Sequence, residues 1–349
     1  MRINCTYAIS AQETFDIDFN DNCIVNPIDY TSNILKVLEP NWKNYIPRNQ
    51  LRRMGKAVRI GVGAGLKLIE ENKDFNKSDA IIITSKNGGL QDCIKFLEQI
   101  IKYGNGALTP TNFVQSTPNA ISGNIALASG NQAYNMTHVN SSFAFIDGLR
   151  DADLLLSEFS NYNVLIGSVE EISDYNYVIN QLEGRYKKEN INSLDLLKSK
   201  TKGSICGESS VFFGLSNNLN GNKIIGYDTL LSDNHEEIIE FIIDFISYHN
   251  LTEVEIDTLL LGLNGDIEAD VIYKELIQSN FKGSSIYSFK DLFGEHPSVI
   301  SMGVWYANSL LNNLKPMNKN LTSNASSMER MLIFNQFDLC ENSVILLSK

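Results

Sequence analysis

The sequence predicts an α/β protein folded as an α-β-α-β-α five-layer sandwich from two similar halves. Strand-turn-helix units recur in the same order in both parts of the chain. The first predicted strand of each half is apolar and does not alternate with polar residues, which is typical of sheets that helices cover on both faces. A chain of 349 residues is also long enough to bury a large core.

The first unit of each half is an apolar strand that runs through an Asn-Gly turn into a helix. In the first half, residues 79–89 lead into an amphipathic stretch at 90–101, where apolar residues recur at helical spacing. In the second half, residues 257–266 lead into a helical stretch at 267–277. The two units match in order and in turn chemistry, which indicates a duplicated fold.

The second unit of each half joins a strand to a helix that is rich in small residues. The strand at 133–139 meets a turn at Asn140 and continues into a helix at 141–156. The strand at 285–289 is followed by a loop and then by the helix at 298–311. Small residues let helices pack closely, so we expect both helices to lie at the centre of the molecule.

A charged segment at 170–202, rich in Asn, Lys and Tyr, lies between the two halves. We expect it to be an excursion over the surface. The predicted division is an N-terminal half at 1–170 and a C-terminal half at 171–349, fused into one unit. A strand at 343–347 ends the chain.

Composition argues against several classes of function. The formal charge is −12, and the clustered Lys and Arg of a nucleic-acid-binding protein are missing. One short basic stretch is predicted to be a solvated helix face: Arg52, Arg53, Lys56 and Arg59. No apolar run approaches the roughly 20 residues that span a bilayer, and the N-terminus lacks an export signal. We therefore expect a cytoplasmic protein that binds neither nucleic acid nor membrane.

The cysteines predict neither a disulfide framework nor a metal site, because they are scattered and form no CxxC pair. They are Cys5, Cys23, Cys93, Cys206 and Cys340. We expect no metal and no cofactor.

Four segments resemble motifs of the β-ketoacyl synthases, a family with the thiolase-like fold. They are LRRMGK at 51–56 (family LRRMDR), STPNAISG at 116–123 (MPNxxAG), CGESSVFF at 206–213 (GEGA and a strand) and KDLFGEHPSVISMG at 290–303 (KxxxGHxxxAAG). They occur in the family's order and at about its spacing over nearly the full length. The resemblance implies that the sandwich is the thiolase-like one.

The family's chemistry needs a cysteine thiolate at the N-terminus of the central helix, where the helix lowers its pKa and forms an oxyanion hole. The segment NMTHVNSSF at 135–143 is similar to the family's nucleophile segment xxSTACxSG. It puts Asn140 at the cysteine's place. An amide cannot hold an acyl thioester, so the resemblance implies that the nucleophile is lost.

The family also uses two histidines, which support decarboxylation of a malonyl thioester. The first belongs to NAHGTxTxxxD, and the similar stretch at 259–266 has Gly262 or Leu263 at that place and no histidine. The second is kept as His296, with Lys290 six residues earlier. His296 could be a hydrogen-bonded scaffold residue or keep a residual catalytic role. Asn140 could have a capping or structural role, or it could take part in decarboxylation or in binding a tetrahedral intermediate.

A mobile gate, FGFGG in the family, corresponds to FDLCE at 337–341. Phe337, Asp338 and Leu339 are its gate-like residues here, and they lack the glycines that would let it swing. We expect structural roles for the other polar candidates: a hydrogen bond or ion pair for Glu208, small apolar burial for Cys206 and Cys340, and surface or edge positions for His235 and His249.

The resemblance favours a chain-length-factor-like subunit, which keeps the fold, does not elongate, and pairs with an active β-ketoacyl synthase as a heterodimer. Pairing would use the strand at 133–139, with Tyr134, Met136 and His138 at the interface. A homodimer is expected when the chain is alone. Acyl carrier proteins are acidic, so docking is expected through the partner.

The pathway implied is of the fatty-acid or polyketide type. Aryl polyene, flexirubin-type and aromatic polyketide systems contain such subunits, and the aryl polyene type is favoured. An alternative is a free-standing malonyl-carrier decarboxylase, or another acyl-thioester enzyme, that uses Asn140 and His296. A third interpretation is a homodimeric scaffold or acyl-binding protein.

Overall fold

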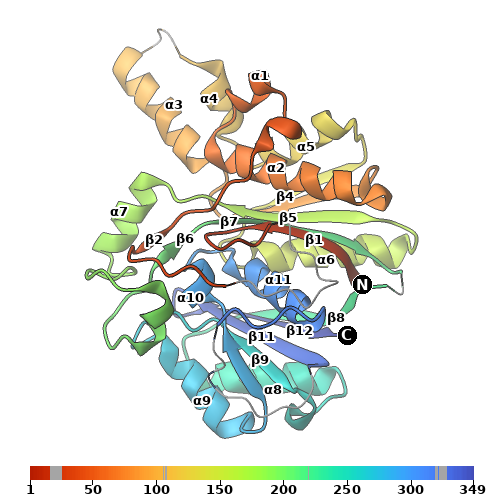
Figure 1. Ribbon diagram of the computed structural model, residues 1–349, viewed down its shortest axis with the longest axis vertical. Coiled ribbons are helices and arrows are strands. Elements are labelled where there is room, and N and C mark those ends of the chain that lie inside the picture. Colours follow the sequence, from red (N-terminus) through yellow and green to blue (C-terminus); the bar gives the residue numbers. More distant parts are fainter. Residues whose placement is uncertain (16–25, 105, 107, 219, 319–320, 322–327) are drawn as a thin grey trace.

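A computed structural model describes residues 1–15, 26–104, 106, 108–218, 220–318, 321 and 328–349. Figure 1 shows five layers that follow one another along the long axis: outer helices, a sheet, central helices, a second sheet and a second set of outer helices. The five-layer sandwich predicted from the sequence is therefore confirmed.

The first sheet contains five strands in the order β1-β7-β5-β3-β4. The pairs β1 with β7 and β7 with β5 are antiparallel, whereas the pairs β5 with β3 and β3 with β4 are parallel. The strands are β1 (Arg2–Ile9), β7 (Ser209–Ser216), β5 (Val164–Glu170), β3 (Ala80–Thr84) and β4 (Tyr134–His138).

The second sheet repeats this pattern in the order β8-β12-β11-β9-β10, with two antiparallel pairs followed by two parallel pairs. Its strands are β8 (Asn222–Leu231), β12 (Glu341–Ser348), β11 (Arg330–Phe337), β9 (Thr258–Leu261) and β10 (Ser285–Ser288). The matching pairings confirm the duplication that the sequence predicted.

The sheets meet where Arg2 and Ile3 of β1 pair with Lys223 and Asn222 of β8. The chain passes from the first sheet to the second between β7 and β8. Strand β7 thus lies in the first sheet although it follows residue 171. Sheet membership does not follow the division into 1–170 and 171–349, which stays a prediction.

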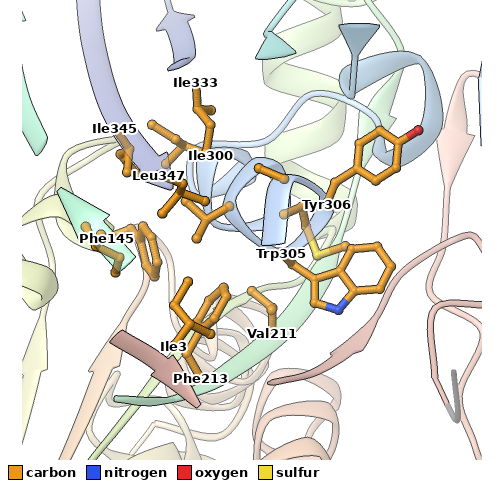
Figure 2. Packing of buried hydrophobic residues seen from close by; sticks show 14 of the residues in the cluster. Ile3, Phe145, Val211, Phe213, Ile300, Trp305, Tyr306, Ile333, Ile345 and Leu347 are labelled. Carbon is orange, nitrogen blue, oxygen red and sulfur yellow. The ribbon is translucent and has the colours of Figure 1, made fainter. Parts of the chain in front are cut away.

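Two helices form the central layer, as their small residues predicted. They are α6 (Ala144–Glu158) and α11 (Val299–Leu311), and every residue of α11 is buried. A Cβ added at Gly148 would lie 2.5 Å from Thr84 Cγ2, so only glycine lets α6 approach β3 this closely. Figure 2 shows the apolar core around these helices, with Ile3 from β1 and Leu347 from β12 in one cluster. The central layer therefore joins the two sheets.

The outer helices are α2 (Lys56–Glu71) and α5 (Ala120–Ser129) over the first sheet, and α8 (His235–Tyr248) and α9 (Asp270–Asn280) over the second (Figure 1). The shorter elements and the projecting helices are α1 (Arg48–Leu51), α3 (Leu90–Tyr103), α4 (Pro110–Gln115), α7 (Asp174–Leu182), α10 (Lys290–Phe293), β2 (Ile34–Leu35), β6 (Cys206–Gly207), η2 (Trp42–Asn44), η3 (Lys73–Phe75), η4 (Ser193–Lys198) and η5 (Glu253–Glu255). No helix within the described ranges is long and apolar enough to cross a bilayer.

The basic stretch near residue 52 is not one solvated helix face. Arg52 and Arg53 lie in the turn between α1 and α2, and both are exposed. Lys56 is ion-paired with Glu208, and Arg59 is ion-paired with Glu39. The prediction was wrong because half of these charges have acidic partners far away in the sequence.

The segment at 170–202 is partly buried rather than a surface excursion. The Lys187 side chain is buried, and its Nζ donates to the carbonyl oxygens of Thr201 and Gly265 at 3.2 and 3.0 Å. Leu196 is fully buried as well. The segment packs against the loop after β9, where the Gly265 carbonyl oxygen accepts a hydrogen bond from the buried amine.

Candidate functional site

The turn between β4 and α6 holds the position predicted to replace the nucleophile. Asn140 is exposed, and its Nδ2 donates to Asp147 Oδ2 at 2.7 Å. The N-cap residue of α6 is Phe143, so Asn140 does not cap this helix, but its bond to Asp147 of α6 fits the structural role also considered for it. The adjacent Ser141 has a φ of +46°, which is uncommon for a residue other than glycine. The chain thus enters the central helix through a strained turn.

A carboxylate from the second half of the chain lies at the entry to α6. Glu341, the first residue of β12, accepts hydrogen bonds through Oε2 from Ser142 N at 3.0 Å and Ser142 Oγ at 2.6 Å. The N-terminal end of a helix favours negative charge. Here that favourable position is occupied by the protein's own side chain.

A buried charge pair joins the first residue of α10 to the loop that follows this helix. The Lys290 side chain is fully buried, and its Nζ donates to Glu295 Oε2 at 2.8 Å and to the Gln336 carbonyl oxygen at 2.9 Å. Asn264 donates from Nδ2 to the same Glu295 oxygen at 2.8 Å. Asp270 in turn accepts from the backbone N–H of Asn264 at 2.9 Å, and burial raises the pKa of Asp270 to about 6.

The spacing of the family motifs places Glu295 and Asn264 where the motifs have histidines, which the sequence analysis missed. In KxxxGH the histidine follows the lysine by five positions, and five positions after Lys290 lies Glu295, directly after Gly294. In NAHG the histidine directly precedes the glycine, and the residue before Gly265 is Asn264 rather than Gly262 or Leu263. Both glycines have positive φ, of +75°. Anchored on these turns, the two histidine positions fall on Asn264 and Glu295, which are hydrogen-bonded to each other.

His296 lies one residue beyond that position and is buried, with its Nε2 at 3.1 Å from Ser209 Oγ. Its Nδ1 has no hydrogen-bond partner among the described residues. Burial, with a smaller contribution from the Lys290 charge, lowers the pKa of His296 to about 3. The imidazole is therefore neutral at physiological pH.

Two adjacent acids at the end of β5, Glu170 and Glu171, join elements around the site. Glu170 accepts through Oε1 from Ser85 Oγ at 3.1 Å and Ser298 Oγ at 3.0 Å, and burial raises its pKa. Glu171 accepts from the backbone N–H of Ala57 at 3.1 Å, and burial raises its pKa to about 7. Sequence reasoning missed both residues, although two acids that directly follow an apolar strand are a detectable signal.

These groups surround a cavity of about 340 Å³. It lies between the ends of β3 and β5, one face of α7, and the loop that precedes α11. Its charged side chains are Lys86, Glu170, Glu171, Glu183, Arg185 and Glu295, its aromatic side chains are Tyr177, Tyr186, His296 and Phe337, and its amides are Asn87, Asn176 and Asn180. The lining mixes charged and amide groups with apolar and aromatic side chains.

The predicted gate is a tight turn between β11 and β12. Phe337 is buried, and Lys86 Nζ lies 5.1 Å from the centroid of its ring. Asp338 and Leu339 have φ angles of +54° and +63°, and Asp338 forms an ion pair with Arg185 at 2.9 Å. These residues line a second cavity of about 680 Å³. A gating role for them stays a prediction.

Glu208 is fully buried and ties distant segments together. It accepts from the backbone N–H of Val37 and of Ile172, both at 2.9 Å, and is ion-paired with Lys56. These contacts fit the structural role predicted for this residue.

The remaining thiols and imidazoles offer little chemistry. Cys206 is buried as predicted, and burial raises the pKa of its thiol to about 12. Cys340 is only partly buried, so the apolar burial expected for it is wrong; it lies in the turn between β11 and β12, and the pKa of its thiol is raised. His235 begins α8 with its Nδ1 at 2.8 Å from Glu275, and His249 is the C-cap of that helix. Cys23 lies outside the described residues.

The predicted interface residues lie on β4, which is an edge strand of the first sheet. Tyr134 and Met136 are 38% and 39% exposed, which leaves both side chains available to a partner. The Nε2 of His138 lies 2.9 Å from Asp151 Oδ2 on α6. His138 is therefore held toward its own subunit, and the interface role of these residues stays a prediction.

Known proteins match the chain in fold and in part of its sequence. A family model described as the β-ketoacyl synthase N-terminal domain matches residues 31–189. No curated protein sequence matches. A β-ketoacyl synthase from Burkholderia phymatum superposes with a TM-score of 0.78 at 12% identity, over 100% of this chain and 99% of that one.

Two further solved structures are assemblies of two kinds of subunit. The ketosynthase ApeO in complex with its chain length factor ApeC, from Xenorhabdus doucetiae, gives a TM-score of 0.76 at 13% identity and covers 99% of this chain and 97% of that one. The ishigamide ketosynthase/chain length factor gives 0.74 at 14%, over 100% and 98%. The thiolase-like fold and the resemblance to β-ketoacyl synthases are thus confirmed.

Proposed function

We propose that this chain, which has the ketosynthase fold and resembles the β-ketoacyl synthases, is a non-elongating, chain-length-factor-like subunit that pairs with an active synthase. The observation that carries the proposal is the hydrogen bonding of Ser142 to Glu341 at the entry to α6. A condensing enzyme needs this region for a thiolate and an oxyanion. A resident carboxylate repels both.

The residues around this turn support the same conclusion. Asn140 carries no nucleophilic atom, and its amide is already bonded to Asp147. Asn264 and Glu295 stand at the motif positions of the histidines. An Asn-Glu pair would not supply the two imidazoles that assist decarboxylation in the family. We therefore expect no condensation by this subunit.

The alternative, a free-standing decarboxylase that uses Asn140 and His296, has less support. The Nε2 of His296 is engaged with Ser209, and burial lowers the pKa of the ring to about 3. Such an imidazole is a weak base near neutral pH. A homodimeric scaffold or acyl-binding protein explains the missing chemistry equally well. It does not explain the similarity to solved assemblies of a ketosynthase with a chain length factor.

We place the subunit in fatty-acid or polyketide-type biosynthesis, with the aryl polyene type as the specific proposal, in the cytoplasm. The acyl carrier protein would dock on the synthase partner, since two acidic surfaces repel each other. The chain alone would form a homodimer.

The experiment is coexpression of the chain with a cysteine-bearing synthase encoded by a neighbouring gene, with a tag on one subunit. The proposal expects a one-to-one complex that survives gel filtration and elongates a carrier-bound starter. Recovery of the two proteins as separate species, at concentrations where the synthase is active, would contradict the pairing.

A further inference from the structure

A tyrosine, a histidine and an aspartate form a cluster where edge strand β4 lies against helix α6. The Nε2 of His138 lies 2.9 Å from Asp151 Oδ2. The Tyr134 hydroxyl lies 3.2 and 3.1 Å from the two oxygens of the same carboxylate and donates to it. Within the described ranges, Asp151 has no lysine or arginine partner. Its charge is therefore held by one hydroxyl and one imidazole.

Water still reaches this cluster in the single subunit. The side chain of Asp151 is 16% exposed and that of His138 is 26% exposed. A carboxylate that keeps some hydration can stay ionised beside neutral donors, but its charge becomes costly when the remaining water is removed and no cation lies beside it. His138 can become that cation by binding a proton.

The other charged groups near the cluster are engaged elsewhere. Strand β4 packs against β3, α5 and α6, and neither β3 nor α5 carries a charged residue. The remaining charged residues on α6 and beside these elements are Lys86, Asp147, Arg150, Asp153, Glu158 and Glu341. Asp147 and Arg150 form an ion pair at 2.9 Å. Glu341 is held at the entry to α6, and Lys86 lies over the Phe337 ring. Among the described residues, His138 is thus the group placed to balance Asp151.

Pairing through β4 would remove the remaining water from the cluster. Side chains at alternate positions of a strand point to the same face, and the contacts of Tyr134 and His138 with Asp151 identify this face as the α6 side. A partner strand laid beside β4 covers that side of the edge. A protonated His138 then forms an ion pair with the carboxylate, which compensates its lost hydration.

We propose that pairing of this subunit with its synthase takes up one proton from solvent at His138, so that the complex is held more tightly at pH 6 than at pH 8. The inference rests on the proposed function and on pairing through β4. A proton that is bound more tightly in the complex than in the free subunit stabilises the complex at low pH, and this stabilisation is lost as pH rises. Histidine is the side chain whose charge ordinarily changes between pH 5 and pH 8.

The test measures the Kd of the complex between this chain and the cysteine-bearing synthase by analytical ultracentrifugation across this pH range. We expect the Kd to fall about tenfold from pH 8 to pH 6. His138→Gln should remove this dependence. His235→Gln is the matched control, because His235 also contacts a carboxylate, that of Glu275 at 2.8 Å, but on the outer helix α8. The control should keep the tenfold dependence.

Asp151→Asn separates charge compensation from a purely structural role. The amide oxygen can still accept from Tyr134 but needs no cation, so we expect this variant to pair more tightly than the unsubstituted chain at pH 8 and to show no pH dependence. Weaker pairing of this variant at pH 8 would contradict the charge argument. The unsubstituted chain and His138→Gln decide the inference even if Asp151→Asn does not fold.

The outcomes separate this inference from the proposed function. A complex whose Kd is the same at pH 6 and pH 8, or a pH dependence that persists in His138→Gln, would overturn the inference and leave the pairing intact. If no complex forms at either pH, the inference and the proposed function both fail.

Discussion

Asn264 donates a hydrogen bond from Nδ2 to Glu295 Oε2 at 2.8 Å, and this bond joins the two places where the family motifs put histidines. The fully buried Lys290 completes the cluster at 2.8 Å from the same oxygen. The three side chains form a fixed, charge-balanced arrangement at the places where the motif resemblance implies proton-transfer groups. Such an arrangement favours binding and rigidity over acid-base chemistry.

The Lys290 and Glu295 pair should behave as one unit in stability measurements. Glu295→Gln alone leaves the Lys290 ammonium buried without its counterion, so we expect the free energy of unfolding to fall by about 3–5 kcal/mol. Adding Lys290→Met should restore most of this loss. Urea denaturation of the single and double variants measures the coupling, and additive losses would show that the two charges do not interact.

Asn140→Cys should not create a synthase. We expect the turnover number for condensation to stay far below roughly 1 s⁻¹, the low end of common kcat values. The variant still has no histidine at either motif position and no glycines in the gate. Turnover at the level of a normal synthase would mean that these parts are dispensable.

The same variant tests the electrostatic effect of Glu341. In the Asn140→Cys background, adding Glu341→Gln should lower the apparent pKa of the introduced thiol by about one unit, because a nearby negative charge is removed. The rate of alkylation as a function of pH measures this pKa. Glu329→Gln, a surface change elsewhere, is the control, and an equal shift there would rule out a local effect.

Glu171 should make the free energy of unfolding fall as pH rises. Its pKa is raised by burial from 4.5 to about 7, so the folded state binds this proton more tightly than the unfolded state. The resulting stabilisation is present at low pH and is lost as pH rises through 7. Between pH 5 and pH 8 we expect a loss of about 2 kcal/mol relative to Glu171→Gln. Parallel pH profiles for the two proteins would contradict the buried, protonated carboxyl.

Edge strand β4 should carry the subunit interface. Tyr134→Asp or Met136→Asp puts a charge on the exposed edge, and we expect the dimer Kd to rise at least 100-fold with a small change in melting temperature. Val254→Asp, at an exposed position on η5, is the matched control. Light scattering that finds a stable monomer for the unsubstituted chain, alone and with its synthase, would contradict any dimer.

The layers of the fold were predictable because they depend on local patterns. Apolar strands with Asn-Gly turns located β3 and β9, and small residues located the central helices α6 and α11. Boundaries moved by a few residues: the helix expected at 141–156 begins at Ala144, because the Ser141 backbone is left-handed.

The site was less predictable because its contacts join residues far apart in the sequence. Glu341 lies 199 positions from Ser142, and nothing in either segment indicates the other. The burial of Lys187 likewise depends on a carbonyl oxygen 78 positions away. The Glu295 position, in contrast, was detectable from the spacing between Lys290 and Gly294, had the motif been anchored on the glycine.

The central claim is that this subunit assists a synthase without carrying the growing chain itself. Intact-mass spectrometry of the complex, after incubation with an acyl-carrier thioester, tests it most directly. We predict one acyl adduct on the synthase subunit and none on this chain, because Asn140 offers no nucleophile and Glu341 occupies the entry to α6. A stoichiometric acyl adduct on this chain would contradict the account.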